Sequence, residues 1–424
     1  MNTTERLYYS DSHLVEFDAR VEAVTRTGDG RAAVTLDRTA FYPTGGGQPS
    51  DTGTLGAARV VECVDAEDAG VLHVVEGEAP EEGASVRGRV DWPRRLDHIQ
   101  QHTGQHILSQ AFVELYGAQT RSFRMTEDAC EIDVDLADPS DEKVERAVGR
   151  ANEIIWDDRA VRIHLVTPDE AARLPLRKDS AREGSLRVIE VEGFDFSPCG
   201  GTHARNSGEV GIIAARHWER AKGLVRVTFV AGGRALADYR RANRAARATA
   251  ALFSVARDDA AEAAARLQEE HKQLQRRLRA AEEIASRFEA RELFEEAARA
   301  SEATGGRTDA KGGGLEATGG ELTVVARVFD ARDAESLRRL AFALAAHTRT
   351  VALLGSREAD AARLVFARAS DAEGDMNALM REACITLEGR GGGHPDMAQG
   401  GGRRVNLLAE VIDAAASTVR GKSR

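Results

Sequence analysis

Hydrophobic positions follow two different periods along the first part of the chain. Between residues 12 and 90, short apolar runs alternate with polar residues and are separated by Gly, Asp and Pro. This pattern is typical of antiparallel strands, and we expect a small N-terminal β-barrel. From Ile99 to Leu115, apolar and histidine positions instead recur every three to five residues, which predicts a helix that begins at Pro93 and ends at Gly117.

The residues that follow this helix predict an α+β domain. A strand is expected at 130–136 and a helix at 140–156, for which the first serine is a suitable N-cap. Two further strands are expected at 187–191 and 225–230. Strands and helices alternate without a repeating βαβ unit, so we expect an α+β domain that ends near Gly233.

Residues 234–303 have the composition of long helices. The segment contains neither proline nor glycine and is rich in Ala, Arg, Glu and Leu. Its apolar or small residues approximate a 4–3 spacing at Leu267, Leu274, Leu278, Ala281, Ile284 and Phe288. Two long helices and one coiled-coil arm both fit this spacing. His271 interrupts the apolar seam, which argues against a long two-stranded coil.

The last part of the chain predicts a compact α/β domain. Residues 304–321 contain seven glycines and indicate a linker or an exposed hairpin. Strand, helix, strand and helix are then expected in order at residues 322–329, 334–347, 351–356 and 364–369, followed by 376–387. A glycine-rich segment at 389–402 precedes a last helix. We therefore expect four parts, namely a glycine-motif barrel at 1–90, an α+β domain at 91–233, a helical arm or coiled coil at 234–303 and a C-terminal α/β domain at 304–424.

Composition narrows the class of protein. A chain of 424 residues is expected to hold two to four domains, and 42% hydrophobic with 30% charged residues is typical of a soluble globular protein. The longest apolar candidate for a membrane helix is far too short, and charges near the N-terminus exclude a secretory signal. We therefore expect a cytoplasmic protein. Its four cysteines lie far apart, which argues against a disulfide framework.

The charge of the chain is unevenly distributed. The net charge of −11 excludes a protein that is basic all over. Residues 203–247 nevertheless hold ten basic and only three acidic side chains. Such a window is expected of a surface that contacts phosphate, and equally of an arginine-rich face that packs against acidic neighbours.

Two histidine motifs carry the strongest chemical signal. His102-Thr-Gly-Gln-His106 lies on the predicted helix, where residues four apart share one face, and Cys199-Gly-Gly-Thr-His203 lies in a glycine-rich turn. Together they could close a tetrahedron of nitrogen and sulfur around Zn²⁺. Either motif alone is weak, because histidine pairs of this spacing usually face solvent. His98 lies one turn earlier, and we expect it to be an outer residue or simply solvated rather than a ligand.

A glycine-rich loop is the second candidate feature. It reads Phe-Tyr-Pro-Thr-Gly-Gly-Gly-Gln-Pro-Ser-Asp-Thr-Gly over residues 41–53. Three consecutive glycines allow a ligand to approach the backbone closely. The loop is not a nucleotide-binding fingerprint, since it lacks the strand-to-helix context. Taken alone, it could be only the tip of a hairpin.

These motifs resemble a known family. The two metal motifs are similar to those of the alanyl-tRNA synthetase editing domain and its free-standing AlaX relatives, and the threonyl-tRNA synthetase editing domain shares the metal pattern. The glycine loop resembles that of the alanine branch. The segment Gly-Gly-Gly-His-Pro-Asp-Met-Ala-Gln-Gly-Gly near the C-terminus resembles a DHHA1-type domain, although relatives commonly carry a basic residue where His394 stands. Nearly the whole chain thus resembles long-form AlaX proteins. Because the glycine-motif unit comes first, we expect no class II aminoacylation core, and the sequence shows no Asp-His-His motif.

The resemblance implies a trans-editing hydrolase. Its expected substrate is Ser-tRNA(Ala), with Gly-tRNA(Ala) as a further candidate, and its expected cofactor is Zn²⁺ held by His102, His106, Cys199 and His203. Gln119 matches a glutamine implicated in the family's editing pocket. Further candidates are Thr44, Gln48 and Thr52 for reading the serine hydroxyl, and Arg205, Arg216, Arg220 and Lys222 for holding tRNA. The resemblance also implies a homodimer formed through the helical arm and the C-terminal domain.

Two other functions fit parts of the sequence. A non-enzymatic tRNA-binding protein with a structural zinc would keep the metal motifs and bind tRNA without hydrolysing an ester. A metal-dependent phosphoesterase is suggested by the C-terminal domain, but it would require clustered aspartates and histidines that the sequence does not show.

Overall fold

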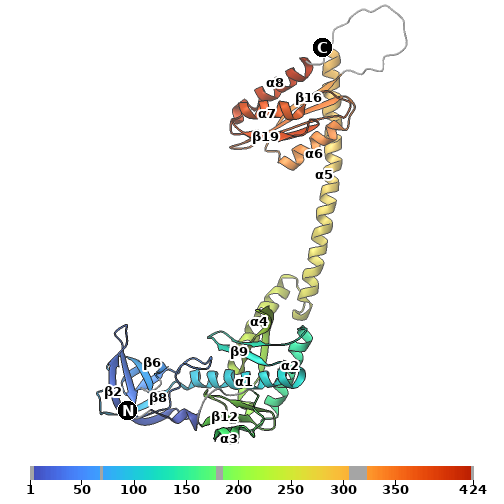
Figure 1. The fold of residues 1–424 in the computed structure, drawn as a ribbon. Helices are drawn as coiled ribbons and strands as arrows, with labels where there is room; N and C mark the ends of the chain where they lie inside the picture. Colours follow the sequence, from blue (N-terminus) through green and yellow to red (C-terminus); the bar gives the residue numbers. More distant parts are fainter. Residues whose placement is uncertain (1–3, 67–69, 178–184, 305–321, 422–424) are drawn as a thin grey trace, which may run out of the picture. The chain divides into compact units, whose positions relative to one another are not determined.

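The computed structural model describes residues 4–66, 70–177, 185–304 and 322–421. The chain divides into two compact units, Met1–Leu252 and Phe253–Arg424 (Figure 1). Within the described residues, no helix combines the length and the apolar character that crossing a membrane requires. The predicted linker at 304–321 lies almost entirely outside the described residues. The four-part division of the chain stays a prediction.

The first unit begins with a closed barrel of six strands, which confirms the predicted architecture. The strands follow the order β2-β3-β7-β6-β5-β8 around the barrel. Their bounds are β2 Glu16–Arg26, β3 Ala32–Leu36, β5 Gly53–Leu55, β6 Ala58–Asp65, β7 Val71–Glu76 and β8 Ser85–Val90. Along the first half of β2 every second side chain, namely Phe17, Ala19 and Val21, is buried in the core of the barrel. Two short strands, β1 (Glu5–Arg6) and β4 (Arg38–Thr39), pair beside it.

The helix predicted between Pro93 and Gly117 is the central element of the α+β domain. It is α1 (Trp92–Tyr116), and most of its middle is buried. Pro93 occupies its first turn, where a missing N–H costs nothing, and Gly117 ends it with φ 67°. The predicted helix after Ser140 is α2 (Asp141–Trp156), and the serine hydroxyl accepts a hydrogen bond from the Lys143 N–H. Both helices are confirmed.

Two antiparallel sheets complete this domain. One has the strand order β14-β15-β10-β9 and the other β11-β12-β13. The bounds are β9 Thr120–Met125, β10 Cys130–Val134, β11 Val161–Val166, β12 Leu186–Val191, β13 Asp195–Pro198, β14 Ile213–Ala221 and β15 Leu224–Ala231, with the short helix α3 at Pro168–Ala171. A single apolar core lies between α1, α2 and these sheets, and it includes Ile107, Phe112, Ile132 and Phe229.

The helical segment forms two helices rather than one arm. These are α4 (Gly232–Leu252), which closes the first unit, and α5 (Ala260–Thr304), which opens the second. Between them Ser254 has a left-handed backbone with φ 56°, and residues 257–259 form a 3-10 turn. Ser254 is neither glycine nor proline, so composition gave no sign of this break.

The second unit is one five-stranded sheet covered on both faces. Its order is β16-β17-β18-β20-β19. The bounds are β16 Thr323–Asp330, β17 Thr350–Arg357, β18 Ala362–Arg368, β19 Arg390–Gly393 and β20 Met397–Gly402, with α6 Ala334–Ala345, α7 Met376–Thr386 and α8 Leu408–Gly421. Val351 and Leu353 of β17 face α7 and α8, whereas the alternate residues Ala352 and Leu354 face α5 and α6. The α/β class is confirmed, but residues 364–368 belong to β18, so the expectation of a helix at 364–369 is wrong.

The glycine-rich segment near the C-terminus is a hairpin of β19 and β20 that lies flat against α7. A Cβ on Gly391 or Gly400 would come within 2.7 or 2.5 Å of the Cys384 Sγ of α7. Side chains at these positions would push the hairpin off the helix. The glycines of this motif therefore serve close packing.

A buried ion pair joins the barrel to α1. Arg95 of α1 and Asp51 of the glycine loop are 0 and 1% exposed. Besides its bonds to the carboxylate, the Arg95 guanidinium donates to the carbonyls of Ser12 (2.7 Å) and Ala40 (2.6 Å). Asp51 also accepts the Tyr42 N–H at 2.6 Å. The second half of the glycine loop thus holds the barrel on the helix that carries two of the predicted metal ligands.

Replacing Asp51 by alanine is expected to destabilise the first unit by about 3–5 kcal/mol, because the Arg95 charge is left buried without its partner. All three tryptophans lie in this unit, so tryptophan fluorescence during urea unfolding reports on it alone. Glu16→Ala is the control, since Glu16 pairs with Arg87 on an exposed surface and its loss should barely move the midpoint. Equal midpoints for the two variants would contradict the proposed role of the pair.

Candidate metal centre

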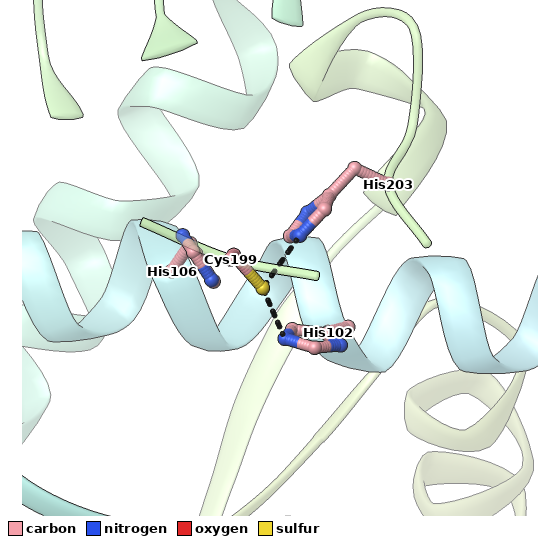
Figure 2. A group of neighbouring side chains, drawn as sticks. All are labelled: His102, His106, Cys199 and His203. Carbon is pink, nitrogen blue, oxygen red and sulfur yellow. Dashed lines mark hydrogen bonds between the residues drawn. The ribbon is translucent and has the colours of Figure 1, made fainter. Parts of the chain in front are cut away.

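Four predicted ligands from two distant segments meet at one point of the first unit. His102 and His106 lie one turn apart on the buried face of α1, while Cys199 and His203 lie in the loop after β13. Their candidate ligand atoms all lie within 4.8 Å of one another. Figure 2 shows the three imidazole rings gathered around the sulfur.

The spacing of these atoms suits a single ion. The Cys199 Sγ lies 3.3 Å from His102 Nε2 and 3.4 Å from His203 Nε2. Around a tetrahedral zinc, with metal–ligand distances of roughly 2.3 Å to sulfur and 2.0 Å to nitrogen, neighbouring ligand atoms would be about 3.5 Å apart. A sulfur and three imidazole nitrogens form a donor set for a borderline-soft metal. The side chains present therefore fit a metal ion.

Each imidazole is fixed by a partner on its other nitrogen. His102 Nδ1 is 2.6 Å from Gln48 Oε1, His106 Nδ1 is 3.2 Å from Asp195 Oδ2, and His203 Nδ1 is 3.2 Å from Thr103 Oγ1. An Nδ1–H that donates to such a partner leaves Nε2 with a free lone pair, which is the form that binds a metal. All three rings are thus oriented with Nε2 available to the cluster.

The electrostatics of the site also suit metal binding. Burial lowers the pKa of His203 to about 3, so this ring is neutral near pH 7. Burial alone would raise the pKa of the Cys199 thiol, but the neighbouring His102 ring, which also bonds the sulfur, holds that pKa well below its ordinary value. A thiolate beside a neutral imidazole is the protonation state that a metal ion requires.

Two cavities border the cluster. The larger, of about 510 Å³, is lined by residues of α1, β9 and β12 and by the Cys199 loop. The smaller, of about 110 Å³, lies against the glycine loop and three tyrosines. Tyr9, Gly46, His102, Cys199 and Gly200 line both cavities. A ligand in either cavity would therefore lie beside side chains of this cluster.

The chain is similar to three known domain families and to several known proteins. Residues 321–421 match the DHHA1 domain, residues 2–94 match a family described as tRNA synthetases class II (A), and residues 186–228 match the threonyl and alanyl tRNA synthetase second additional domain. The alanyl-tRNA editing protein AlaX-L of Pyrococcus horikoshii is 38% identical over 55% of this chain and 59% of its own length. The alanine–tRNA ligase of Natronomonas pharaonis is 34% identical over 98% of this chain and 44% of its own length.

The chain is thus similar to an alanyl-tRNA editing protein over about half of its length and to alanine–tRNA ligases over nearly all of it. It spans 59 and 44% of the length of the two relatives named above. Among solved structures, the C-Ala domain of Aquifex aeolicus alanyl-tRNA synthetase is 32% identical and matches 22% of this chain and 93% of its own, with a TM-score of 0.20. The match to the second additional domain includes Cys199 and His203.

The three residues that were predicted to read the serine hydroxyl lie in different surroundings. Thr44 is exposed, lines the smaller cavity, and its Oγ1 accepts the Ser50 N–H at 3.1 Å. Gln48 is 1% exposed and bonds His102. Thr52 donates its hydroxyl to the Asp91 carboxylate at 2.6 Å. The structure thus brings Thr44 and Gln48 to the cluster, and it gives Thr52 a partner at the start of α1.

Gln119 and His98 do not belong to the cluster of four side chains. The backbone N–H of Gln119 donates to the Asp135 carboxylate. The described residues that line the larger cavity include its neighbour Thr120 and Gln105 of α1, but not Gln119. A catalytic role for Gln119 stays a prediction. His98 is 2% exposed, so the expectation that it is solvated is wrong, and no described residue bonds its buried Nδ1.

The four predicted tRNA-binding cations differ in how they are paired. Arg205 reaches Asp11 at 3.2 Å, and Arg216 reaches Asp238 at 2.9 Å. Arg220 and Lys222 are exposed where β14 turns into β15. Part of the basic window thus pairs with acidic side chains and part of it faces solvent, and a role of these cations in tRNA binding stays a prediction.

Three residues that support the site were not predicted. Arg187 is 7% exposed and donates to the carbonyls of Cys199 (2.8 Å) and Gly201 (2.9 Å). Asp195, which orients His106, also accepts a hydrogen bond from Arg177 at 2.8 Å. Asp195 lies four residues before Cys199, so its place near a predicted ligand could have indicated it. The two arginines gave no such sign, because their partners lie in other segments.

Proposed function

We propose that this chain is a zinc-dependent, trans-editing aminoacyl-tRNA deacylase that hydrolyses the ester of Ser-tRNA(Ala). The observation that carries the proposal is the cluster of three histidines and one cysteine beside a cavity of about 510 Å³, in a chain related to an alanyl-tRNA editing protein. We further propose tRNA(Ala) as the partner, a cytoplasmic location, and a homodimer formed through the helical segment and the C-terminal unit.

A separate editing site is needed because serine differs from alanine by a single hydroxyl. An apolar pocket rejects an added hydroxyl by only about 10²-fold. A size sieve does not help either, since alanine is smaller and enters wherever serine does. The editor must therefore read the hydroxyl by hydrogen bonding, which discriminates far better. Thr44 is our candidate, because it lines the cavity beside the cluster with a hydroxyl that accepts one bond and can still donate.

The side chains of the chain would prepare the ester for attack by water. His102, His106, Cys199 and His203 would hold Zn²⁺, and Gln48, Asp195 and Thr103 would keep the rings aligned. When bound there, Zn²⁺ would supply Lewis-acid chemistry and an anchor for the acyl-adenosine end. Arg187 would keep the Cys199 loop in place through two carbonyls. The exposed Arg220 and Lys222 would contact the phosphate backbone, an attraction that salt weakens.

A non-enzymatic tRNA-binding protein with a structural zinc is the second candidate. The observation that favours it is the complete set of four ligands, because structural zinc sites are closed whereas catalytic sites usually keep a position open. The two functions differ in whether the purified protein breaks the ester.

One assay separates these functions. Purified protein is incubated with acyl-labelled Ser-, Gly- and Ala-tRNA(Ala), with and without a chelator, and loss of label is followed over time. We expect rapid loss of serine, sparing of alanine, and activity that disappears with chelator and returns with Zn²⁺. Stoichiometric zinc and tRNA binding without loss of any label would instead support the structural-zinc alternative.

A further inference from the structure

Gln48 connects the N-terminal barrel segment to the metal cluster. It lies in the glycine loop before β5, and its side chain is 1% exposed. Its backbone is held in a tight turn, in which the Gln48 N–H donates to the Gly45 carbonyl (2.9 Å) and the Gly45 N–H donates to the Gln48 carbonyl (3.0 Å). The side chain therefore leaves the turn from a fixed backbone.

Both ends of the Gln48 amide bind parts of the site. Oε1 accepts from His102 Nδ1 at 2.6 Å and from the Thr202 N–H at 3.3 Å, while Nε2 donates to Thr202 Oγ1 at 2.8 Å. These bonds occupy both lone pairs of the oxygen and one of the two N–H donors. The amide has little capacity left for a substrate hydroxyl.

The two partners of Gln48 belong to the two halves of the ligand set. His102 comes from α1, whereas Thr202, which is fully buried, lies between Cys199 and His203 in the loop. One amide thus fixes the protonated nitrogen of one ligand and the backbone that carries two others. Partners of this kind around a metal-binding histidine typically change metal affinity 10- to 100-fold when they are removed.

We propose that Gln48 is a positioning residue, through which the barrel segment aligns His102 and the Cys199 loop for metal binding. This inference rests on the proposed metal site. It departs from the sequence-based prediction that Gln48 reads the serine hydroxyl, and the two roles have different consequences. A positioning role alters metal affinity without substrate present, whereas a hydroxyl-reading role leaves that affinity unchanged and alters the preference for serine over alanine.

The test measures metal affinity in the full chain without tRNA. Zn²⁺ affinity is obtained by competition with a chromophoric chelator, and the visible spectrum of the Co²⁺-loaded protein reports ligand geometry. We expect Gln48→Met, which keeps the side-chain length but forms none of these bonds, to bind Zn²⁺ roughly 10- to 100-fold more weakly and to change the Co²⁺ spectrum. Gln48→Glu can still accept from His102 and should recover most of the affinity.

A matched control comes from another glutamine, Gln100, which lies in α1. Gln100 joins the Glu209 carbonyl (3.0 Å) and the Gly233 N–H (3.1 Å), so Gln100→Met removes two similar bonds that involve no ligand. It should bind Zn²⁺ as the wild type does. Should Gln48→Met fail to fold by tryptophan fluorescence, Thr202→Val removes the loop partner of the amide and is expected to weaken Zn²⁺ binding as well.

The outcomes are distinguishable. A wild-type protein that binds no Zn²⁺ would overturn the proposed metal site itself. Tight binding by the wild type with unchanged affinity in Gln48→Met, or in Thr202→Val where that variant is used, would overturn the positioning role while leaving the metal site standing. An equal loss in Gln100→Met would also overturn it, because the effect would then belong to general packing.

Discussion

Replacing His102 or Cys199 by alanine is expected to abolish both metal binding and hydrolysis of Ser-tRNA(Ala). Each change removes one of the four atoms of the cluster and leaves three, and these two side chains form its 3.3 Å contact between the helix and the loop. The loss should exceed the roughly 10- to 100-fold effect of an outer residue. Metal content by elemental analysis and release of acyl label provide the two measurements.

Two control variants show whether the loss of activity comes from the position in the cluster or merely from removing a histidine or a cysteine. His164→Ala removes a histidine of the same domain that pairs with Glu190 at 2.8 Å, and Cys384→Ala removes a cysteine of the second unit. Both should keep metal and activity. In the His102 and Cys199 variants the second unit should remain folded, because its core is separate. Full turnover in either ligand variant would refute the metal-dependent mechanism.

The proximity of two of the four clustered side chains could be predicted from the sequence because helical periodicity is local. His102 and His106 share a face on any regular helix, and α1 has clear start and stop signals in Pro93 and Gly117. The partners that orient the rings could not be predicted in this way. Gln48 lies 54 residues from His102, and Asp195 lies 89 residues from His106. Only the fold brings such pairs together.

One error in the fold, and one helix break that the sequence left open, have a similar origin. Residues 364–369 form a short apolar run, and such a run gives no period that separates a buried strand from a helix. In the structure it is β18, which lies between β17 and β20 and is buried on both faces. The break at Ser254 is a single left-handed residue in a segment of helix-forming composition. Tertiary context overrides local preference at both places.

The second large effect is expected at Gly201, in the loop between two ligands. A Cβ placed there would lie 2.2 Å from Cε1 and 2.5 Å from Nδ1 of His102, and 3.0 Å from Gln48 Oε1. Carbon atoms in favourable contact are about 3.5–4.0 Å apart, so the ring or the loop would have to move. Gly201→Ala should therefore separate Cys199 from His102 and remove most of the bound metal.

The neighbouring glycine provides a matched control for this change. A Cβ on Gly200 would meet the Tyr9 hydroxyl at 3.6 Å, which is an ordinary contact, and neither glycine has a left-handed φ. Gly200→Ala and Gly201→Ala thus add the same methyl group to adjacent residues of one loop. Zn²⁺ affinity should stay near the wild-type value in the first and fall by more than about 10-fold in the second. Equal affinities in the two variants would mean that the close packing of His102 on Gly201 does not hold the ligands together.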